Sequence, residues 1–268
     1  MSKPERVVTQ KLPDAMGGVV RYVSDPEHPF DPICLDTGAL ASAGLITGEA
    51  SAGRGNTVFF TLREQPLVLR HYRRGGLIRH ISKAHYFFFG LQKTRAMREF
   101  DLLLFLQAEG LPASLPYASR VLPKGLLYMA SLVTYRLPGK TLAELLLADG
   151  SLSPEPAVEE RLWRNVGELI ARFHLAGVYH ADLNAHNIML DEEGTISLLD
   201  FDRGRIRALP EDPSIAGWCL DNMRRLERSL NKIAVTMSGN KSDINSLPAK
   251  LAFCQEQWAI SLTSSAHS

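Results

Sequence analysis

The amino-acid sequence predicts an α+β protein with two lobes, a small antiparallel-sheet lobe followed by a mainly helical lobe. Short strand-like segments occupy much of residues 56–135, and helical periodicity begins after Leu137-Pro-Gly-Lys140. A chain of 268 residues that is 45% hydrophobic can also bury a core. We therefore expect a first lobe with an N-terminal extension over residues 1–136, and a second lobe over residues 137–268.

The first forty residues are rich in Pro, Gly and Asp and show weak periodicity, so we expect them to wrap around the first lobe. Residues 48–55 then predict a glycine-containing turn, which is followed by strands over residues 56–62 and 67–72. Such a turn can cover a phosphate, which makes Gly53 and Gly55 candidate contacts of a nucleotide. An ordinary loose turn explains the same glycines equally well.

One basic and one acidic residue stand out in the first lobe. Alternation in the second strand places Arg70 on the same face as Val68 and Tyr72. A helix is predicted over residues 94–109, and Glu99 lies on its apolar stripe. A buried carboxylate needs a partner, so we expect an ion pair between Glu99 and Arg70. Alternatively, Arg70 extends into solvent from an edge strand.

Two further strands are predicted over residues 117–122 and 126–135, before the second lobe begins. Thr141 and Glu144 have the spacing of a capping box, which opens a helix. Apolar residues recur at helical spacing over residues 162–173 and predict a longer helix after it.

The second lobe carries polar residues at fixed spacing, His180-Ala-Asp182-Leu-Asn-Ala-His-Asn187, followed by Asp-Phe-Asp beginning at Asp200. Two short strands closed by a turn would bring Asn187 and Asp200 to neighbouring strand ends. Carboxylate and amide oxygens suit a hard cation such as Mg²⁺. The spacing predicts phosphoryl transfer, in which Asp182 orients a hydroxyl while Asn187 and Asp200 hold the metal.

The same polar residues are compatible with two alternatives to phosphoryl transfer. Polar residues gather by chance in turns, and this accounts for part of the motif. A non-haem iron site is the second alternative, because His180-x-Asp182 with a distant histidine is the pattern of some oxygenases. Such sites normally lie in a β-barrel, whereas residues 162–173 before the motif have helical spacing. The periodicity therefore favours phosphoryl transfer.

Composition limits the cellular setting. Cys34, Cys219 and Cys254 are scattered and lack the spacing of a metal site, which indicates reduced thiols in a cytosolic setting. The N-terminal residues lack a signal-peptide core, and no apolar run approaches the ~20 residues of a spanning helix, so we expect a protein that does not cross a membrane. The net charge of +1 and the lack of a binding motif argue against nucleic-acid binding, and no protein partner is evident.

The glycine turn, the strand arginine, the helix glutamate, the catalytic loop and the metal aspartate together resemble the protein-kinase superfamily over residues 48–202. Ala181 stands where regulated protein kinases have an arginine that binds a phosphorylated loop, and no Ala-Pro-Glu segment follows. The chain is more closely similar to the 3-deoxy-D-manno-octulosonic acid (Kdo) kinase family. This similarity covers most of the chain and rests on residues 69–76, 179–187 and 199–204 and on the tail around Trp218 and residues 224–232.

The resemblance implies a bilobal protein-kinase-like fold that uses ATP and Mg²⁺. It implies phosphorylation of the 4-hydroxyl of a Kdo sugar on a Kdo-lipid A precursor in lipopolysaccharide core biosynthesis, by a protein in peripheral contact with the cytoplasmic side of the bacterial inner membrane. Asp182 becomes the catalytic residue, and Asn187 and Asp200 the metal ligands. The nucleotide would contact Gly53, Gly55, Val68, Arg70, Glu99 and Met189, with adenine beside the backbone of residues 133–136. A place in the core explains Met189 nearly as well.

Three positions depart from the general kinase pattern. Arg70 replaces a lysine, Asn184 replaces a basic residue, and Asp202 replaces a glycine. A neutral amide at Asn184 cannot meet the charge of the γ-phosphate. We expect Arg203 or Arg205 to supply that charge, unless these side chains are only solvated.

The acceptor implied by the resemblance is an anionic glycolipid, and two segments suit it. The aromatic run 86–89 lies beside Arg79, Lys83 and Lys93 and suits a membrane interface, although a core role explains it equally well. The last long helix is predicted to bury one stripe and to present a basic face to a carboxylate or phosphate of the lipid. The stripe is Leu220, Met223, Leu226, Leu230 and Ile233, and the basic face is Arg224, Arg225, Arg228 and Lys232.

Two alternatives to a Kdo kinase remain open on the sequence alone. The first is another small-molecule kinase, of the heptose or aminoglycoside phosphotransferase type. The second is a catalytically inactive kinase-like binding module, because Arg70 and Asn184 are unusual at their positions.

Overall fold

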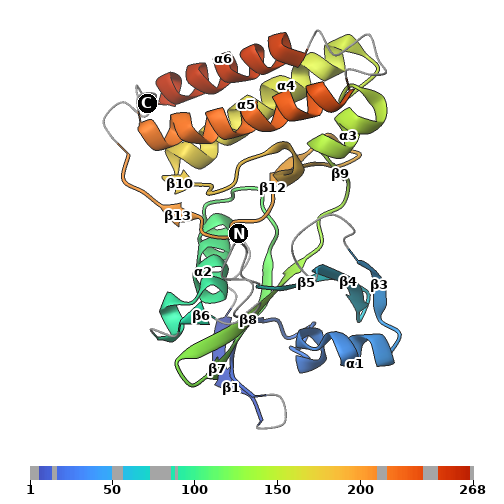
Figure 1. Ribbon diagram of the computed structural model, residues 1–268, viewed down its shortest axis with the longest axis vertical. Helices are drawn as coiled ribbons and strands as arrows, with labels where there is room; N and C mark the ends of the chain where they lie inside the picture. Colours follow the sequence, from blue (N-terminus) through green and yellow to red (C-terminus); the bar gives the residue numbers. More distant parts are fainter. Residues whose placement is uncertain are drawn as a thin grey trace. The chain divides into compact units, whose positions relative to one another are not determined.

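The computed structural model describes residues 6–13, 17–49, 57–72, 86–87, 90–209, 216–237 and 247–265 (Figure 1). The chain forms two compact units. The sheet unit comprises Met1–Phe105 and Ser114–Arg136, and the helical unit comprises Leu106–Ala113 and Leu137–Ser268. The predicted α+β class, with an antiparallel-sheet lobe and a mainly helical lobe, is confirmed.

The described part of the sheet unit contains one antiparallel sheet, in the order β1-β2-β7-β8-β5-β4-β3, with β6 paired to β8. Its strands are β1 (Arg6–Lys11), β2 (Val19–Ser24), β3 (Ile46–Glu49), β4 (Thr57–Leu62), β5 (Gln65–His71), β6 (Tyr86–Phe87), β7 (Pro116–Lys124) and β8 (Leu127–Tyr135). β5 begins two residues earlier than predicted, because Arg63 and Glu64 form a two-residue turn with φ angles of 48° and 67°. Asn or Gly usually marks such a turn, so the sequence offers no cue for it.

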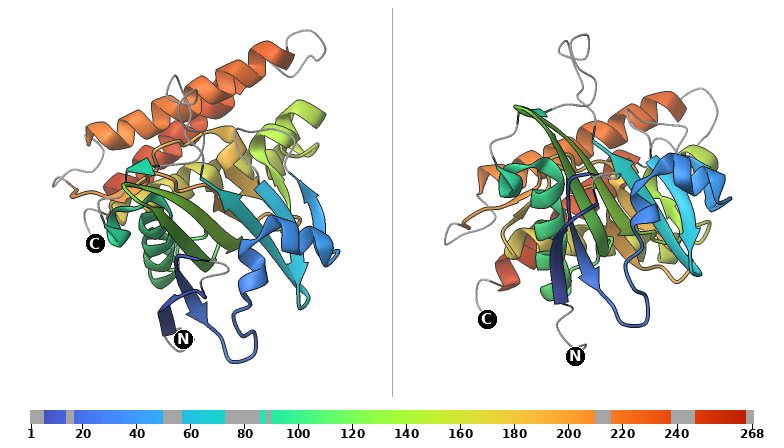
Figure 2. Two further views of the ribbon diagram at one scale, coloured as in Figure 1. Left: turned by 60° about the horizontal axis from the view of Figure 1, so that its bottom comes forward. Right: turned by 90° about the horizontal axis from the view of Figure 1, so that it is seen from below.

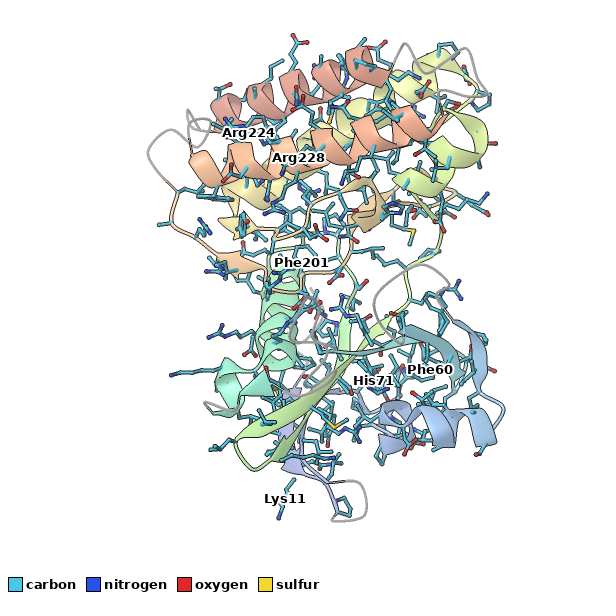
Figure 3. All side chains as sticks on the ribbon, viewed as in Figure 1. Lys11, Phe60, His71, Phe201, Arg224 and Arg228 are labelled. Atoms are coloured by element: carbon cyan, nitrogen blue, oxygen red, sulfur yellow. The ribbon has the colours of Figure 1, made fainter. Side chains whose placement is uncertain are left out.

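The first forty residues extend the sheet and cover part of it. β1 pairs with β2, and β2 pairs with β7 (Figure 2). Two short helices follow, η1 (Pro32–Leu35) and α1 (Thr37–Ser42), and each begins after an aspartate whose carboxylate accepts a backbone N–H. Helices of four and six residues are too short to show a periodic pattern, which explains the weak signal. Their buried residues share one core with β4, β5 and β8: Leu35, Leu40, Phe60, Leu67, Leu69 and Val133 (Figure 3).

α2 (Arg95–Ala108) follows η3 (Leu91–Lys93) and agrees with the helix predicted over residues 94–109. The guanidinium of Arg21 in β2 bonds the carboxylate of Asp101 at 2.5 Å and lies over the ring of Phe100. Phe100 is fully buried. α2 is therefore fixed against the sheet at the turn that carries Glu99.

The helical unit contains α3 (Leu142–Asp149), α4 (Pro156–Leu175), α5 (Gly217–Met237) and α6 (Leu247–Ser265). The predicted capping box is present, since Thr141 and Glu144 bond each other's backbone at the start of α3. α6 is absent from the elements predicted above, although its buried residues recur every three or four positions: Leu247, Leu251, Cys254, Trp258 and Leu262. None of the described helices is long and apolar enough to cross a membrane.

α4 and α6 approach each other at the level of the backbone. A Cβ atom placed on Gly167 of α4 would lie 2.4 Å from the carbonyl oxygen of Cys254 in α6. Only glycine permits this approach, because no side-chain atom fits at that distance. Figure 1 shows α4, α5 and α6 side by side as a helical layer.

A chain of buried polar groups joins these three helices. The indole N–H of Trp258 in α6 donates to Nδ1 of His174 in α4 at 2.9 Å. Nδ1 therefore carries no proton, so Nε2 of His174 donates to Oδ1 of Asn222 in α5, at 3.2 Å. His174 and Asn222 are essentially inaccessible to water. The three helices are thus linked through a neutral histidine.

The neutral state of His174 predicts a pH-dependent stability. Burial lowers the pKa of His174 to about 4. Because an unfolded histidine titrates near pH 6.5, the unfolded chain binds a proton between pH 6.5 and about 4 that the folded chain does not. Stability should fall as the pH is lowered through this range, with a contribution on the order of 3 kcal/mol from this residue.

Urea unfolding at several pH values measures this contribution. His174→Gln keeps one acceptor and one donor but does not titrate, so its loss of stability between pH 6.5 and 4 should be smaller than that of the unchanged protein. An equal loss in both proteins would contradict the assignment of a neutral, buried His174.

Candidate active site

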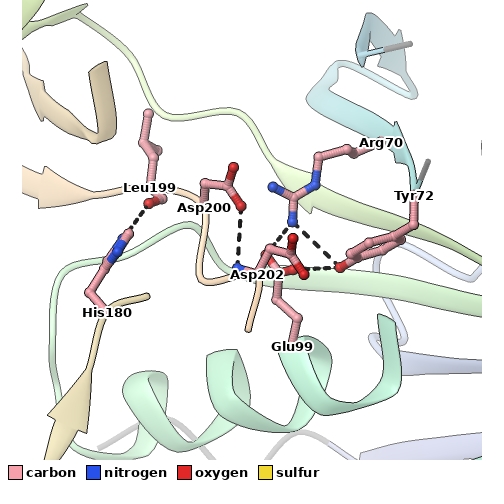
Figure 4. A network of polar contacts seen from close by, with 7 residues as sticks. All are labelled: Arg70, Tyr72, Glu99, His180, Leu199, Asp200 and Asp202. Atoms are coloured by element: carbon pink, nitrogen blue, oxygen red, sulfur yellow. Dashed lines mark hydrogen bonds and ion pairs between the residues drawn. The ribbon is translucent and has the colours of Figure 1, made fainter. Parts of the chain in front are cut away.

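The motif at residues 180–187 forms a loop that begins after β10 (Val178–Tyr179) and ends in η4 (Ala185–Asn187). Its first residue, His180, is buried, and both of its ring nitrogens are bonded. Nδ1 accepts the backbone N–H of Asp182 at 3.1 Å, so Nε2 carries the proton and donates to the carbonyl of Leu199 at 2.8 Å (Figure 4). Burial lowers the pKa of His180, which keeps the ring neutral.

α5 holds this loop at both ends. The backbone N–H of His180 donates to Oδ1 of Asn222 at 3.2 Å, and the amide of Asn222 donates back to the carbonyl of His180 at 2.6 Å. Further along α5, the hydroxyl of Ser229 accepts the N–H of Ala185 at 3.1 Å. Asn222 and Ser229 were not among the predicted site residues. Sequence spacing within α5 gives no sign that polar side chains reach a loop forty residues earlier.

Asp182 presents an exposed carboxylate at the tip of the loop. Its backbone carbonyl accepts from the amide groups of Asn184 and Asn187, each at 2.9 Å. Within the described residues, the Asp182 carboxylate forms no ion pair. The loop thus fixes the backbone of Asp182 and leaves its side chain available to a reactant.

Asn187 and Asp200 lie next to each other in the hairpin, as predicted. β11 (Ile188–Leu190) pairs with β12 (Ile196–Leu198), and the N–H of Leu199 donates to the carbonyl of Asn187 at 2.9 Å. Asp200 follows at once and has a φ of 59°, and its carboxylate accepts the N–H of Asp202 (Figure 4). A left-handed aspartate is uncommon and marks a sharp turn of the chain.

Phe201 holds this turn in place from the inside. Its ring is buried, stacks on Phe173 of α4 with centroids 5.7 Å apart, and lies 4.8 Å from the ring of His180 (Figure 3). The buried phenylalanine anchors the Asp-Phe-Asp segment, in which Asp200 is exposed and Asp202 is half-buried. The segment therefore combines a rigid core residue with polar ends.

The donor atoms of the hairpin fit a hard divalent cation. Because Nδ2 of Asn187 donates to the carbonyl of Asp182, its Oδ1 remains as an acceptor, and Asp200 follows the residue whose N–H bonds the Asn187 carbonyl. Amide and carboxylate oxygens are the ligands of Mg²⁺ and Ca²⁺. The iron alternative fails, because both ring nitrogens of His180 are occupied and no group of three His, Cys, Asp or Glu side chains gathers among the described residues.

In the sheet unit, the predicted ion pair between Arg70 and Glu99 is present (Figure 4). Glu99 is 3% exposed, and its second carboxylate oxygen accepts the hydroxyl of Tyr72 at 2.5 Å. Burial, together with the Glu99 charge, raises the pKa of Tyr72, so the phenol stays protonated and can donate. Tyr72 shares the predicted face with Arg70, but its part in the network was not foreseen.

Of the remaining predicted nucleotide contacts, the structure describes Val68 and Met189. Val68 lies in β5 and is half-buried, on the face opposite the buried Leu67 and Leu69. Met189 is half-buried in β11, where it pairs with Ser197 and Thr141. Gly53 and Gly55 lie outside the described residues, as do Arg79, Lys83 and Phe88–Phe89 of the predicted membrane-facing segment.

The prediction that residues 133–136 offer backbone donors to adenine is wrong for two of them. The N–H of Tyr135 donates to the carbonyl of Leu115, and the N–H of Arg136 donates to the carbonyl of Pro66, each at 2.9 Å. The strand β8 continues to Tyr135, so these groups belong to the sheet. The strand predicted over residues 126–135 ends at the same residue as β8, so the error lies in expecting free donors on residues that the strand and its neighbours already use.

Asn184 has a structural role in the loop. It is the N-cap of η4, its carbonyl oxygen accepts the N–H of His186, and its amide donates to Asp182. Both ends of the side chain are thus engaged within the loop. Asn184 therefore does not supply the positive charge that the general kinase pattern has at this position.

Comparisons with known proteins show the family to which the chain is similar. The family model described as lipopolysaccharide kinase (Kdo/WaaP) family matches residues 41–249. The chain is 38% identical to a 3-deoxy-D-manno-octulosonic acid kinase of Vibrio parahaemolyticus over 77% of this chain and 81% of that protein. It is 39% identical to that of Vibrio vulnificus over 81% and 85% of the two chains, and 42% identical to that of Stenotrophomonas maltophilia over 68% of each.

A solved structure, "WaaP in complex with acyl carrier protein", is 17% identical and aligns with 83% of this chain and 91% of that chain, with a TM-score of 0.48. The matched residues 41–249 contain Arg70, Glu99, Asp182, Asn187 and Asp200. The resemblance identified from the sequence is confirmed. Since the family model spans most of the sequence, the chain belongs to the lipopolysaccharide kinase (Kdo/WaaP) family.

Proposed function

We propose that the protein transfers the γ-phosphoryl group of ATP to the 4-hydroxyl of a Kdo sugar on a Kdo-lipid A precursor. The observation that carries this proposal is the loop at residues 180–187, which fixes the backbone of Asp182 and leaves its carboxylate exposed in a chain of the lipopolysaccharide kinase family. The relatives named 3-deoxy-D-manno-octulosonic acid kinase support the choice of sugar. We expect the reaction at the cytoplasmic side of the bacterial inner membrane, by a peripheral protein.

Asp182 is the proposed catalytic base. Its carboxylate is exposed and forms no ion pair among the described residues, while its backbone is fixed by three hydrogen bonds, from its own N–H to His180 and to its carbonyl from Asn184 and Asn187. The hydroxyl oxygen of the sugar attacks the γ-phosphorus, the bond to the β-γ bridging oxygen breaks, and the hydroxyl proton passes to the carboxylate of Asp182. ADP leaves with the bridging oxygen.

Asn187 and Asp200 are the proposed metal ligands. A kinase uses ATP and in general a divalent metal, and we propose Mg²⁺ because the available donors are an amide oxygen and a carboxylate. A bound Mg²⁺ would neutralise charge on the phosphates. The pairing of Asn187 with Leu199 keeps the two ligands at adjacent positions before any ion binds.

Arg70 is the proposed phosphate contact of the sheet unit. Glu99 and Tyr72 fix its side chain, so the guanidinium is oriented before ATP arrives. We further propose that Val68, Met189 and the glycines at positions 53 and 55 contact the nucleotide. The lobes proposed from the sequence, residues 1–136 and 137–268, then supply phosphate contacts and catalytic groups respectively. The absence of a nucleic-acid or protein partner stays a prediction.

An acceptor assay tests the function directly. ATP consumption should require Kdo-lipid A precursor, and the new phosphate should lie on the 4-position of Kdo when the product is analysed by mass spectrometry and NMR. A heptosylated core without a free Kdo 4-hydroxyl and an aminoglycoside should not stimulate consumption. Stimulation by either of these alone would favour the heptose or aminoglycoside alternative, and consumption with none of the three would favour an inactive binding module.

The role of Asp182 predicts a large loss of turnover on amidation. Asp182→Asn keeps the backbone contacts of the loop but cannot accept the proton, so turnover should fall on the order of 10²- to 10⁴-fold. ATP binding and unfolding temperature should be unchanged. Glu192→Gln, an exposed acid in the turn after β11, is the matched control. Near-normal turnover of Asp182→Asn would refute the assignment.

A single and a triple substitution around Arg70 distinguish a structural role of this residue from a phosphate-binding role. Arg70→Met removes a cation beside the buried Glu99 and should cost about 3–5 kcal/mol of stability. The triple variant Arg70→Met, Tyr72→Phe, Glu99→Met replaces the network by apolar groups and should recover most of that stability. Its kcat/KM for ATP should remain reduced about 10- to 100-fold, because the contact to phosphate is still missing. Recovery of both stability and kcat/KM in the triple variant would mean that Arg70 is only structural.

A further inference from the structure

α5 runs along the catalytic loop between two fixed points. Asn222 bonds the backbone of His180, and Ser229 bonds the backbone of Ala185. The two α5 residues are seven positions apart, which is two helical turns or ~10 Å. The edge of α5 between them therefore follows the loop that carries Asp182.

Three basic residues lie on the outward side of that edge, and we call them the basic shelf: Arg225, Arg228 and Lys232. At 100° per residue, Ser229 lies about 20° from Asn222 around the helix axis, and Arg225, Lys232 and Arg228 follow in the same direction at about 60°, 80° and 120° from Asn222. The opposite side of α5 is buried through Cys219, Met223, Leu226, Leu230 and Ile233. The basic shelf therefore lies between the loop at residues 180–187 and solvent. Figure 3 shows Arg228 on α5.

The three charges are not used to hold the fold together. Among the described residues, Arg225, Arg228 and Lys232 form no side-chain hydrogen bond or ion pair, whereas their neighbour Arg224 pairs with Asp221 at 3.3 Å. Like charges three and four positions apart on a helix repel each other and destabilise it. The charge of Arg225 also reaches His180, whose pKa it helps to lower. An uncompensated cluster beside a reactive carboxylate suits an anionic ligand.

We propose that the basic shelf binds an acidic group of the acceptor glycolipid, a carboxylate or a phosphate, and thereby delivers the sugar hydroxyl to Asp182. The inference rests on the proposed function. It favours the acceptor over ATP because the shelf follows the loop that presents Asp182, the proposed acceptor of the hydroxyl proton, while the proposed phosphate contact, Arg70, belongs to the sheet unit. It also distinguishes Arg225 from Arg224, which the predicted basic face grouped together.

Kinetics with the Kdo-lipid A precursor test the shelf. The variant Arg225→Gln, Arg228→Gln, Lys232→Gln should raise the KM for the acceptor by about tenfold or more, the loss expected for charge-assisted contacts, and leave the KM for ATP within about twofold. Its unfolding temperature should not fall. The matched control is Lys11→Gln, Lys124→Gln, Arg161→Gln, which removes the same charge from three exposed positions without a partner in the described chain.

Acceptor analogues identify the acidic group. An acceptor with its lipid A phosphates removed and one with its sugar carboxylate reduced are compared in the unchanged protein and in the shelf variant. The analogue that lacks the recognised group should show the same KM with both proteins. If the difference between the proteins survives undiminished in both analogues, no acidic group of the acceptor binds the shelf, and the inference is wrong.

Two results separate this inference from the proposed function. If the unchanged protein does not phosphorylate the Kdo-lipid, the proposed function fails, whatever the shelf variant does. If it does phosphorylate the lipid, the inference alone fails when the shelf variant keeps a normal acceptor KM. It also fails when the control variant loses as much as the shelf variant, since general attraction to an anionic surface would then explain both losses.

Discussion

The geometry of the active site depends on a single buried histidine that bonds at both ring nitrogens. His180 accepts from the backbone of Asp182 and donates to the carbonyl of Leu199, so it joins the residue before Asp200, the proposed metal ligand, to Asp182, the proposed base. Only the neutral ring can do both, because a protonated imidazole has two donors and no acceptor. Burial enforces that state by disfavouring the charged form.

A second neutral histidine extends this arrangement into the helices. Asn222 contacts the backbone of His180 on one side and the ring of His174 on the other, and His174 accepts from Trp258 of α6. Each donor along this path meets an acceptor, so no buried polar group in it is left unpaired. α6 packs closely on α4 at Gly167 and is bonded through His174 to Asn222, which bonds the backbone of His180. In this way α6 helps to hold the loop at residues 180–187 in place.

Much of the site could be predicted from the sequence because its residues are close together along the chain. The loop at residues 180–187, the hairpin that follows and the side of β5 that carries Arg70 all depend on local spacing, and the pair with Glu99 follows from the cost of burying a lone carboxylate. The parts that were missed are not local. Asn222 and Tyr72 act through contacts that span 42 and 27 positions, and no single-sequence pattern encodes such partners. α6 is different, since its helical spacing was present in the sequence.

The absence of a basic residue at position 184 follows from the hydrogen bonds that the Asn184 side chain makes within the loop. Asn184 caps η4 and bonds Asp182 with its two amide ends, which a lysine or arginine could not do, because neither has an acceptor. A loop built around a capping asparagine must therefore obtain positive charge from other elements.

α5 is bonded to both ends of that loop and carries cations on the edge beside it, so it can supply charge toward the acceptor without disturbing the cap. Arg70, oriented by Glu99 and Tyr72 on its own unit, is suited to the phosphates of the nucleotide. Under the two proposals, Arg70 supplies charge for ATP and α5 supplies charge for the acceptor, so each source of charge can be changed without altering Asp182.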